Sequence, residues 1–286
     1  MSVAVVTDST AYLPEGFADR RSVRVIPLHV LVDGVGRLDG VDFGPAELAG
    51  ALGDRRTVTT SRANPAELAA EYRKALEDGA EAVVAVHLSG ELSGTWNAAW
   101  MAAEEVGPDR VRIVDSRSTA MGLGFAVLAA ADAAAAGASP AEVERAATRV
   151  AARARTFFSV ETLEHLRRGG RIGATAALLG TALSVKPLLH VEDGRIVPLE
   201  KVRTTSRAIA RLVDLAANAA GRGPVELAVH HLAAPERAAE LAAKLESRLP
   251  NCPGCLISEV GPVIGAHTGP GVLGVVVVPG GLNPPA

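Results

Sequence analysis

A histidine and a threonine near the C-terminal end are the residues best placed to contact a ligand. His267 and Thr268 lie in the segment Val263-Ile264-Gly265-Ala266-His267-Thr268-Gly269-Pro270-Gly271. This segment joins two apolar runs that predict strands, and its glycines allow a sharp turn and a close approach by another group. We therefore expect a bend that presents both polar side chains. The alternative is a plain β-hairpin in which His267 only satisfies a backbone group.

Hydroxyl side chains gather at four further points. They are Thr7-Asp8-Ser9-Thr10, Thr59-Thr60-Ser61, the segment Leu88 to Thr95, and Asp115-Ser116. Three of these segments directly follow apolar runs that predict strands. Hydroxyls and backbone N–H groups at helix N-termini bind anions. Each segment alone also fits an ordinary helix N-cap, but together with His267 and Thr268 they favour one shared anion site.

The first half of the chain alternates predicted strands and helices. Apolar runs predict strands at residues 3–6, 82–88 and 111–114, and helical spacing predicts helices at residues 65–78, 97–106 and 121–136. Asp33-Gly34 predicts a hairpin turn after a strand over Arg24–Val32. Nearly continuous apolar strands indicate a parallel sheet covered on both faces. Ligands of such sheets bind at the carboxyl ends of the strands.

The second half has a different order of elements. Ser139-Pro140-Ala141-Glu142 predicts the start of a helix, and Asp193-Gly194 predicts a second hairpin. Further helices are predicted at residues 162–168, 174–183, 206–219 and 235–248. The fold class is therefore α/β, with an N-terminal parallel-sheet α/β/α domain packed on a smaller two-layer α+β domain. We place these domains at residues 1–153 and 154–286.

Composition excludes several classes of protein. The 286 residues are 48% hydrophobic but only 3% aromatic, and the net charge is −3. A nucleic-acid binder would show a basic patch with aromatic stacking groups. Two cysteines make no disulfide framework, the first residues do not form a signal peptide, and the apolar stretch Ala120–Ala138 is broken by Asp132. We expect a cytoplasmic monomer without cofactor, nucleic-acid partner or stable membrane insertion.

An ordered set of short motifs resembles the DegV family of bacterial fatty-acid-binding proteins. In the first half the motifs are Thr7–Thr10, Thr60-Ser61, Leu88–Asn97 and Val114-Asp115-Ser116. In the second half they are Leu166–Ile172, Ser184–Leu189, Lys201–Thr204 and Ile264–Gly271. Each motif is short, but they follow one another in the order of the family from residue 3 to about residue 280.

The resemblance implies a carrier that encloses one long-chain fatty acid in an apolar tunnel. It presents the carboxylate to a separate fatty acid kinase for acyl phosphate formation and does no chemistry alone. By motif, the residues implied to bind the carboxylate are Thr60, Ser61, Ser93, His267 and Thr268. Arg171 and Arg203 are implied to face the kinase or the transferring phosphate, and no metal is implied.

The residues themselves agree with such a ligand. Hydroxyls can hold a carboxylate and leave its oxygens accessible, whereas a bidentate arginine would block both. About 15 methylene groups at about 0.8 kcal/mol each supply about 12 kcal/mol of transfer free energy, so a tunnel would dominate the affinity. Met121–Phe125, with two glycines, is a candidate for its lining. Arg62-Ala63-Asn64 departs from the family pattern, which leaves head-group recognition open.

Three alternatives use the same residues or other reactive side chains. A Ser-His hydrolase acting on acyl esters would need Ser93, His267 and an aspartate, either Asp8 or Asp115, in contact. The first glycine of the Gly-x-Ser-x-Gly elbow is missing at Ser93. The Cys252-Pro253-Gly254-Cys255 motif fits a loop with two thiols better than a redox site, because it lies between a helix and a strand. His190, His230 and His231 raise the possibility of a metal, but adjacent residues on a strand face opposite sides.

Overall fold

The first half of the molecule is built on a parallel sheet. The structure, a computed structural model, describes residues 2–172 and 185–282. Four strands have the order β2-β1-β6-β7 and all neighbours are parallel. They are β1 (Val3–Asp8), β2 (Val23–Ile26), β6 (Ala82–His87) and β7 (Val111–Asp115). Every residue of β6 is buried, which confirms that helices cover both faces.

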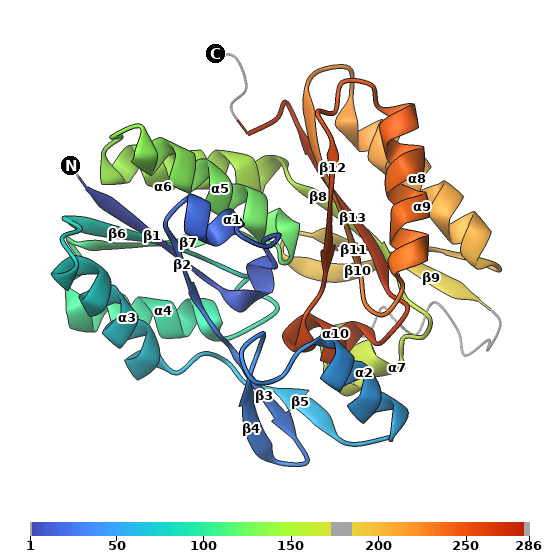
Figure 1. The fold of residues 1–286 in the computed structure, drawn as a ribbon, viewed down its shortest axis with the longest axis horizontal. Coiled ribbons are helices and arrows are strands. Elements are labelled where there is room, and N and C mark those ends of the chain that lie inside the picture. The colour runs from blue at the N-terminus through green and yellow to red at the C-terminus, as the bar shows by residue number, and fades with distance from the viewer. Residues whose placement is uncertain (1, 173–184, 283–286) are drawn as a thin grey trace.

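Helices lie on the two faces of this sheet. They are η1 (Ser9–Ala11), α1 (Phe17–Arg20), α3 (Pro65–Glu77), α4 (Thr95–Val106), α5 (Met121–Ala135) and α6 (Pro140–Arg153). α3 and α4 cover one face, and α5 and α6 cover the other (Figure 1). The predicted start of α6 is confirmed, because the backbone N–H of Ser139 donates to Glu142 at 2.8 Å in a capping box.

A small antiparallel sheet projects from the first half. It contains β3 (His29–Val32), β4 (Val35–Leu38) and β5 (Val58–Thr60), and α2 (Pro45–Gly53) lies beside it. The predicted Asp33-Gly34 hairpin is confirmed, with φ of 51° and 83° at these two positions. The single strand predicted over Arg24–Val32 is wrong. The chain leaves the parallel sheet at Pro27, which has no N–H to donate, and enters the small sheet at His29.

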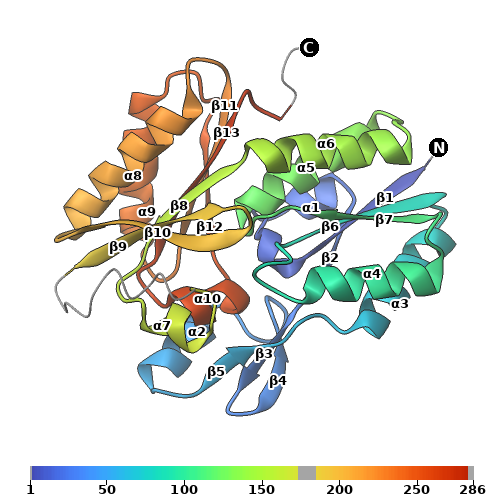
Figure 2. The ribbon, with the colours of Figure 1, turned by 180° about the vertical axis from the view of Figure 1, so that it is seen from behind.

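The second half contains a six-stranded sheet with the order β10-β9-β8-β13-β11-β12. Its strands are β8 (Arg155–Ser159), β9 (Lys186–Glu192), β10 (Arg195–Val202), β11 (Val225–His231), β12 (Cys255–Glu259) and β13 (Leu273–Pro279). Only the β11–β12 pair is parallel among these described strands. The helices of this half are α7 (Glu164–Arg168), α8 (Thr205–Ala220), α9 (Pro235–Arg248) and α10 (Pro262–Thr268). α8 and α9 cover the face of the sheet that points away from the first half (Figure 2).

The α/β fold class is confirmed by this arrangement of a parallel sheet and separate antiparallel or mixed sheets. The hairpin at Asp193-Gly194 is confirmed as well, between β9 and β10. The four-stranded sheet lies within residues 1–153 and the six-stranded sheet within residues 154–286. The division into two domains stays a prediction, and the helix predicted at residues 174–183 lies outside the described residues.

His267 and Thr268 lie in the last turn of α10, which corrects the predicted bend. The helix begins at Pro262 in the favourable first position. It ends at Gly269, whose φ is 74°. Gly265 allows the close packing of α10, since a Cβ there would overlap Leu48 of α2. The β-hairpin alternative is wrong, because β11 lies between β12 and β13 in the sheet.

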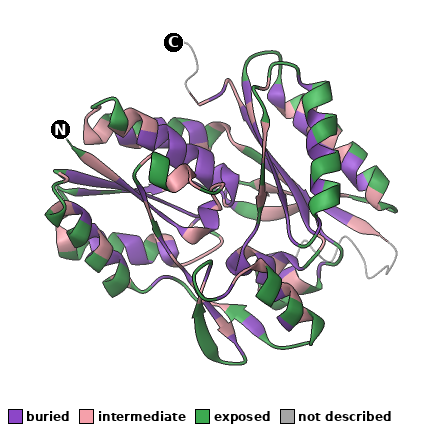
Figure 3. Ribbon diagram, viewed as in Figure 1, coloured by how far each residue is buried: buried purple, intermediate pink, exposed green. Residues whose placement is uncertain are grey.

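Two buried apolar clusters form the core, and the larger one extends across both halves. It contains Val84 and Leu123 from the first half together with Leu189 and Val276 from the second. Figure 3 shows the buried strands and helices meeting between the halves. The smaller cluster fills the space between the six-stranded sheet and α8 and α9, where Leu212 and Leu241 are fully buried.

Candidate functional site

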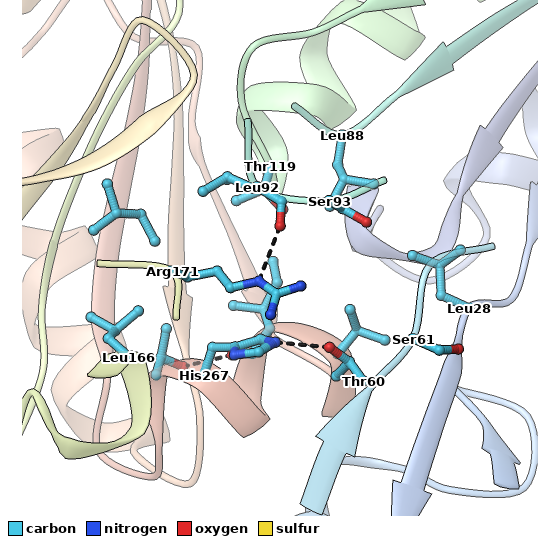
Figure 4. A pocket seen from close by; sticks show the side chains of 14 residues that line it. Leu28, Thr60, Ser61, Leu88, Leu92, Ser93, Thr119, Leu166, Arg171 and His267 are labelled. Carbon is cyan, nitrogen blue, oxygen red and sulfur yellow. Dashed lines mark hydrogen bonds between the residues drawn. The ribbon is translucent and has the colours of Figure 1, made fainter. Parts of the chain in front are cut away.

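Two adjacent chambers that share four lining residues lie where the two halves meet the small sheet, and Figure 4 shows the first of them. We call the first the polar chamber; it is lined by Leu28, Thr60, Ser61, Leu88, Leu92, Ser93, Thr119, Leu166, Arg171, Ile196, Val263, Ile264, His267 and Thr268. We call the second the apolar chamber; it shares Thr119, Ile196, Ile264 and Thr268 with the first. Each has a volume of about 60 Å³, so both chambers are narrow, and we call the two together the cavity.

The polar chamber brings together all five predicted ligand-binding residues, each from the end of an element. They are Thr60 at the end of β5, Ser61 after it, Ser93 before α4, and His267 and Thr268 at the end of α10. Arg171, which follows α7, also lines it. Arg203 does not, because it is exposed after the end of β10. Ser61 is exposed, so solvent reaches this end of the cavity.

His267 and Thr60 face each other across the polar chamber. The Nε2 atom of His267 lies 2.8 Å from the hydroxyl oxygen of Thr60. Burial and, to a smaller extent, the nearby positive charge of Arg171 together lower the pKa of His267 to about 4. The imidazole is therefore neutral at pH 7, with one donor and one acceptor nitrogen. It can orient the Thr60 hydroxyl without placing a second cation in the chamber.

Ser93 is held by the residues that start α4. Its hydroxyl lies 3.0 Å from the hydroxyl of Thr95 and accepts from the backbone N–H of Thr95 at 3.2 Å. The Thr95 hydroxyl in turn accepts from the N–H of Ala63, at 3.2 Å, so the segment after β5 is fixed to the start of α4. Arg62 lies outside the chamber with its methylene groups against Gly94. Arg62, where the sequence departs from the family pattern, is therefore not among the residues that line the chamber.

Arg171 connects the second half to the first at the wall of the polar chamber. Its Nε donates to the carbonyl of Leu92 at 3.1 Å and its Nη1 to the carbonyl of Gly169 at 2.6 Å. The guanidinium points toward the space between Thr60 and His267 in Figure 4. The chamber is therefore lined by five hydroxyl side chains, a neutral imidazole and one cation, which is a set of groups suited to a carboxylate or another small anion.

The apolar chamber is lined mainly by aliphatic and aromatic carbon. Phe158, Val260, Val272 and Val275 form much of its wall. Its histidine, His230, accepts from the N–H of Met121 at 3.0 Å, and its other ring nitrogen lies 3.3 Å from the carbonyl of Ser258. Burial lowers the pKa of His230 to about 4, so this side chain is neutral and both nitrogens are engaged. The chamber is therefore suited to hydrocarbon.

Thr119 is a polar lining residue that sequence analysis missed. It lies between β7 and α5 and lines both chambers, and its hydroxyl oxygen is buried without a hydrogen-bond partner among the described residues. Thr119 follows the predicted strand at residues 111–114, and this position could have indicated it. The prediction for the end of that strand names Asp115-Ser116 instead. Those residues hold the loop instead, where Asp115 accepts from the N–H of Arg117 at 2.7 Å.

Two other predicted contributions to the cavity are wrong. Asp8 is fully buried and accepts from the Thr10 hydroxyl at 2.5 Å and from the N–H of Leu88 at 3.0 Å, so it closes the end of the sheet. Met121–Phe125 lies in α5 and is buried without lining either chamber. Its glycines serve helix packing, since a Cβ on Gly124 would lie 3.0 Å from the carbonyl oxygen of Ala11.

The geometry does not support the hydrolase. Within the described residues, Ser93 and His267 share no hydrogen bond, because Ser93 is paired with Thr95 and His267 with Thr60. The Nδ1 atom of His267, which a triad aspartate would hold, has no partner in the same described chain. Asp8 instead pairs with His87, whose Nδ1 atom lies 3.0 Å away.

The cysteines and the remaining histidines take separate positions. Cys252 lies in the loop after α9 and Cys255 begins β12, and both thiols are free. Burial raises the pKa of Cys255 to about 12, which disfavours a reactive thiolate. His231 faces Glu259 at 3.5 Å, on the other side of β11 from His230. Residues 2–172 and 185–282 contain no cluster of three or more His, Cys, Asp or Glu placed to hold a metal ion, and no helix long and apolar enough to cross a membrane.

A buried carboxyl group supports α10 from behind. Asp39 accepts from the hydroxyls of Ser9 at 2.6 Å and Tyr12 at 3.0 Å, and the Tyr12 hydroxyl accepts from the N–H of Ile264 at 3.3 Å. Burial raises the pKa of Asp39 to about 6. These bonds fix the start of α10, and thereby the end that carries His267, to the first half of the molecule.

Residues 2–280 match the model of the DegV family, which is described as "Uncharacterised protein, DegV family". The chain belongs to the DegV family. A DegV domain-containing protein of Streptomyces coelicolor is 54% identical over 275 residues, which cover 96% of this chain and 98% of that protein. The recognition made from the ordered motifs is thereby confirmed.

Solved structures of DegV proteins have the same fold. "Fatty Acid Binding of a DegV family Protein from Thermus thermophilus" superposes with a TM-score of 0.92 at 34% identity, covering 98% of this chain and 100% of that one. "DegV, a fatty acid binding protein from Bacillus subtilis" has a TM-score of 0.88 at 33% identity, with 97% and 99% covered. Both DegV relatives are thus described as binding fatty acids.

Proposed function

We propose that this DegV protein binds one long-chain fatty acid, with the carboxylate in the polar chamber and the acyl chain in the apolar chamber. The observation that carries the proposal is that the two chambers share four lining residues, with the hydroxyls and the cation in one chamber and a hydrocarbon lining in the other. A fatty acid has the same division of chemistry along its length. The two DegV relatives described as binding fatty acids support the same ligand class.

The head group would be held by hydrogen bonds that favour its ionised form. With the proton on Nε2, His267 donates to Thr60, whose own hydroxyl hydrogen is then free to donate to the carboxylate. Ser93 supplies a second hydroxyl, and Arg171 supplies the compensating charge. Hydrogen bonds to an ionised group are worth about 1.5–3 kcal/mol each. Together these groups orient the ligand, and the buried methylene groups provide most of the affinity.

The second part of the proposal is that this protein presents the bound fatty acid to a separate kinase. The polar chamber lies at the end of the cavity where Ser61 is exposed, so the carboxylate is the part of the ligand that a second protein would reach. In that step a carboxylate oxygen attacks the γ-phosphorus of ATP, the bond to the bridging oxygen breaks, and ADP leaves. Arg171 lies beside the reacting oxygen, and exposed Arg203 offers charge to an acidic kinase surface. Because this role needs ATP, we expect the protein to act in the cytoplasm. We expect it to act there as a monomer.

Lipid analysis tests the ligand class directly. Denaturing extraction of the purified protein, followed by mass spectrometry, should recover about one acyl chain per protein. Delipidated protein should bind palmitate or oleate in calorimetry. Recovery of no lipid together with no uptake of either acid would overturn the proposal.

Kinase-dependent acyl phosphate formation tests the carrier role separately. With a kinase that acts on the wild-type carrier, Arg203→Ala should lower the rate of acyl phosphate formation and leave palmitate affinity unchanged, because Arg203 lies outside the cavity. Arg207→Ala, an exposed arginine on α8, is the matched control. An unchanged rate in Arg203→Ala would contradict the assigned role of this residue.

A further inference from the structure

An open groove of about 520 Å³ lies beside the apolar chamber, and the two share a wall of side chains. Two residues, Thr156 and Val191, line both the apolar chamber and the groove. The groove itself carries charged groups, including Arg117, Arg155 and Glu192. Hydrocarbon lining and a polar, water-accessible surface therefore meet at Thr156 and Val191.

The strand pairing explains why only these two side chains separate the apolar chamber from the groove. The β8–β9 ladder extends from the Ser159–Leu188 pair to the Phe157–His190 pair and stops there. Thr156 and Val191 are the next residues along the two strands, so no described backbone pairing joins the strands at this point. Thr156 remains in the sheet through its other neighbour, Val276 of β13. The space between the separated strands is filled by side chains, not by backbone hydrogen bonds.

The wall is fixed in place from the first half of the molecule. The hydroxyl of Thr156 lies 3.3 Å from the hydroxyl of Ser118, which precedes α5. Ser118 lines the groove but not the chamber. Gly122 of α5 packs against both, and a Cβ there would lie 3.0 Å from the Thr156 hydroxyl and would overlap Ser118. Thr156 is 8% exposed and therefore cannot move aside without disturbing these contacts.

We propose that Thr156 and Val191 form the end wall of the acyl site and set the longest chain that the protein accepts. This inference rests on the proposed function. Each methylene group that enters the apolar chamber tightens binding about fourfold. A chain that is too long for the cavity has no further hydrocarbon surface to contact at the wall. It must displace Thr156 or Val191 toward the polar groove, so affinity stops rising with chain length at that point.

Competition among chain lengths tests the wall. Delipidated protein is incubated with equal amounts of the saturated acids from 14 to 22 carbons, repurified, and the bound acids are quantified by gas chromatography. Wild-type protein should show a maximum followed by a fall. In Val191→Ala and in Thr156→Ala the bound fraction of the acids beyond the maximum, relative to the preferred acid, should rise about tenfold. The double variant should move the maximum itself to longer chains.

Two controls separate the wall from other effects of the substitutions. Val272→Ala removes the same atoms from the apolar chamber at a residue that does not line the groove, and it should leave the maximum in place. Thr156→Val keeps the volume of the side chain and removes only its hydroxyl, so the wild-type distribution should remain. A distribution unchanged in both alanine variants, or shifted equally in Val272→Ala, would overturn the inference. Failure of wild-type protein to take up any acid would instead overturn the proposed function.

Discussion

The imidazole of His267 occupies the space that a side chain on Gly169 would need. A Cβ built on Gly169 would overlap Nδ1 of His267 and lie 2.7 Å from its Cε1 atom. The glycine at the end of α7 therefore determines where the histidine of α10 can lie. It also explains in steric terms why the Gly169-Gly170-Arg171 motif and the His267-Thr268 motif, about a hundred residues apart, belong to one site.

Replacing Gly169 tests this packing. Gly169→Ala should displace the imidazole, lower palmitate affinity about tenfold or more, and destabilise the fold by about 1–3 kcal/mol through overpacking. Gly170→Ala is the matched control: φ is 70° there, and no described atom lies within 4 Å of the added Cβ. It should cost about 1–2 kcal/mol of stability and leave affinity intact. Calorimetry and thermal unfolding measure both. Equal affinity in the two variants would refute the steric relationship.

Ser93 tests the placement of the carboxylate. Ser93→Ala removes one hydroxyl from a site that holds an anion, so fatty-acid affinity should fall about ten- to a hundredfold, which corresponds to about 1.5–3 kcal/mol. The helix should survive, because Thr95 and the following residues keep the start of α4. Thr148→Ala, an exposed hydroxyl on α6, should change nothing. If both Ser93→Ala and Thr60→Ala bind as the wild type does, the head group lies elsewhere.

Arg171 has a structural role and a binding role that one pair of variants separates. Arg171→Ala removes the cation of the polar chamber and its two bonds to backbone carbonyls, so both palmitate affinity and melting temperature should fall, affinity by about tenfold. Arg171→Lys should recover part of the affinity as a point charge but not the two bonds. Arg168→Ala, which breaks only an exposed pair with Glu164, is the control. Unchanged palmitate affinity in Arg171→Ala would show that Arg171 stabilises the structure but does not bind the ligand.

Asp39 should make stability depend on pH. Its pKa is raised to about 6 in the folded protein by burial, against about 3.9 in the unfolded chain. The folded state therefore binds the extra proton between these values, so the stabilisation is full below about pH 4 and is lost as the pH rises through 6. Asp39→Asn keeps an acceptor for Ser9 and Tyr12 and does not titrate. The wild-type protein should lose on the order of 2–3 kcal/mol relative to Asp39→Asn between pH 4 and pH 7.

Urea unfolding at several pH values measures this difference. Taking the difference between the two proteins removes the opposite contribution of His267 and His230, whose lowered pKa values weaken the fold as the pH falls. If the difference in the free energy of unfolding between the wild type and Asp39→Asn did not change with pH, Asp39 would already be ionised at pH 4.

The parts of the fold that sequence analysis predicted are those specified by local chemistry. Asp33-Gly34 and Asp193-Gly194 supply the positive φ values that their hairpins require, and Ser139 with Glu142 supplies a capping box. The shared site was predictable because Ser93 lies in the loop between a predicted strand and a predicted helix, Thr60 precedes another predicted helix, and the order of the motifs matched a family. These signals need no knowledge of distant residues.

The errors arise where tertiary contacts decide the structure. Val263–Thr268 has no strong helical signal, and the short α10 is held by Leu48 and by the Tyr12 hydroxyl at its start. Thr119 carries no motif, and its place in the cavity depends on residues distant in the sequence, Ile264 and Thr268 of α10, which line the same chamber. The tunnel role predicted for Met121–Phe125 failed because glycine serves close helix packing as readily as close ligand approach.

The larger apolar cluster has a consequence for the cooperativity of unfolding. Since residues such as Val84 and Val276 share one buried cluster, separating the halves would expose that surface on both of them at once. We therefore expect the two halves to unfold together, because separating them would expose part of the larger cluster on each of them. Heating should accordingly produce one cooperative transition, with equal calorimetric and van't Hoff enthalpies, and residues 1–153 expressed alone should aggregate rather than fold.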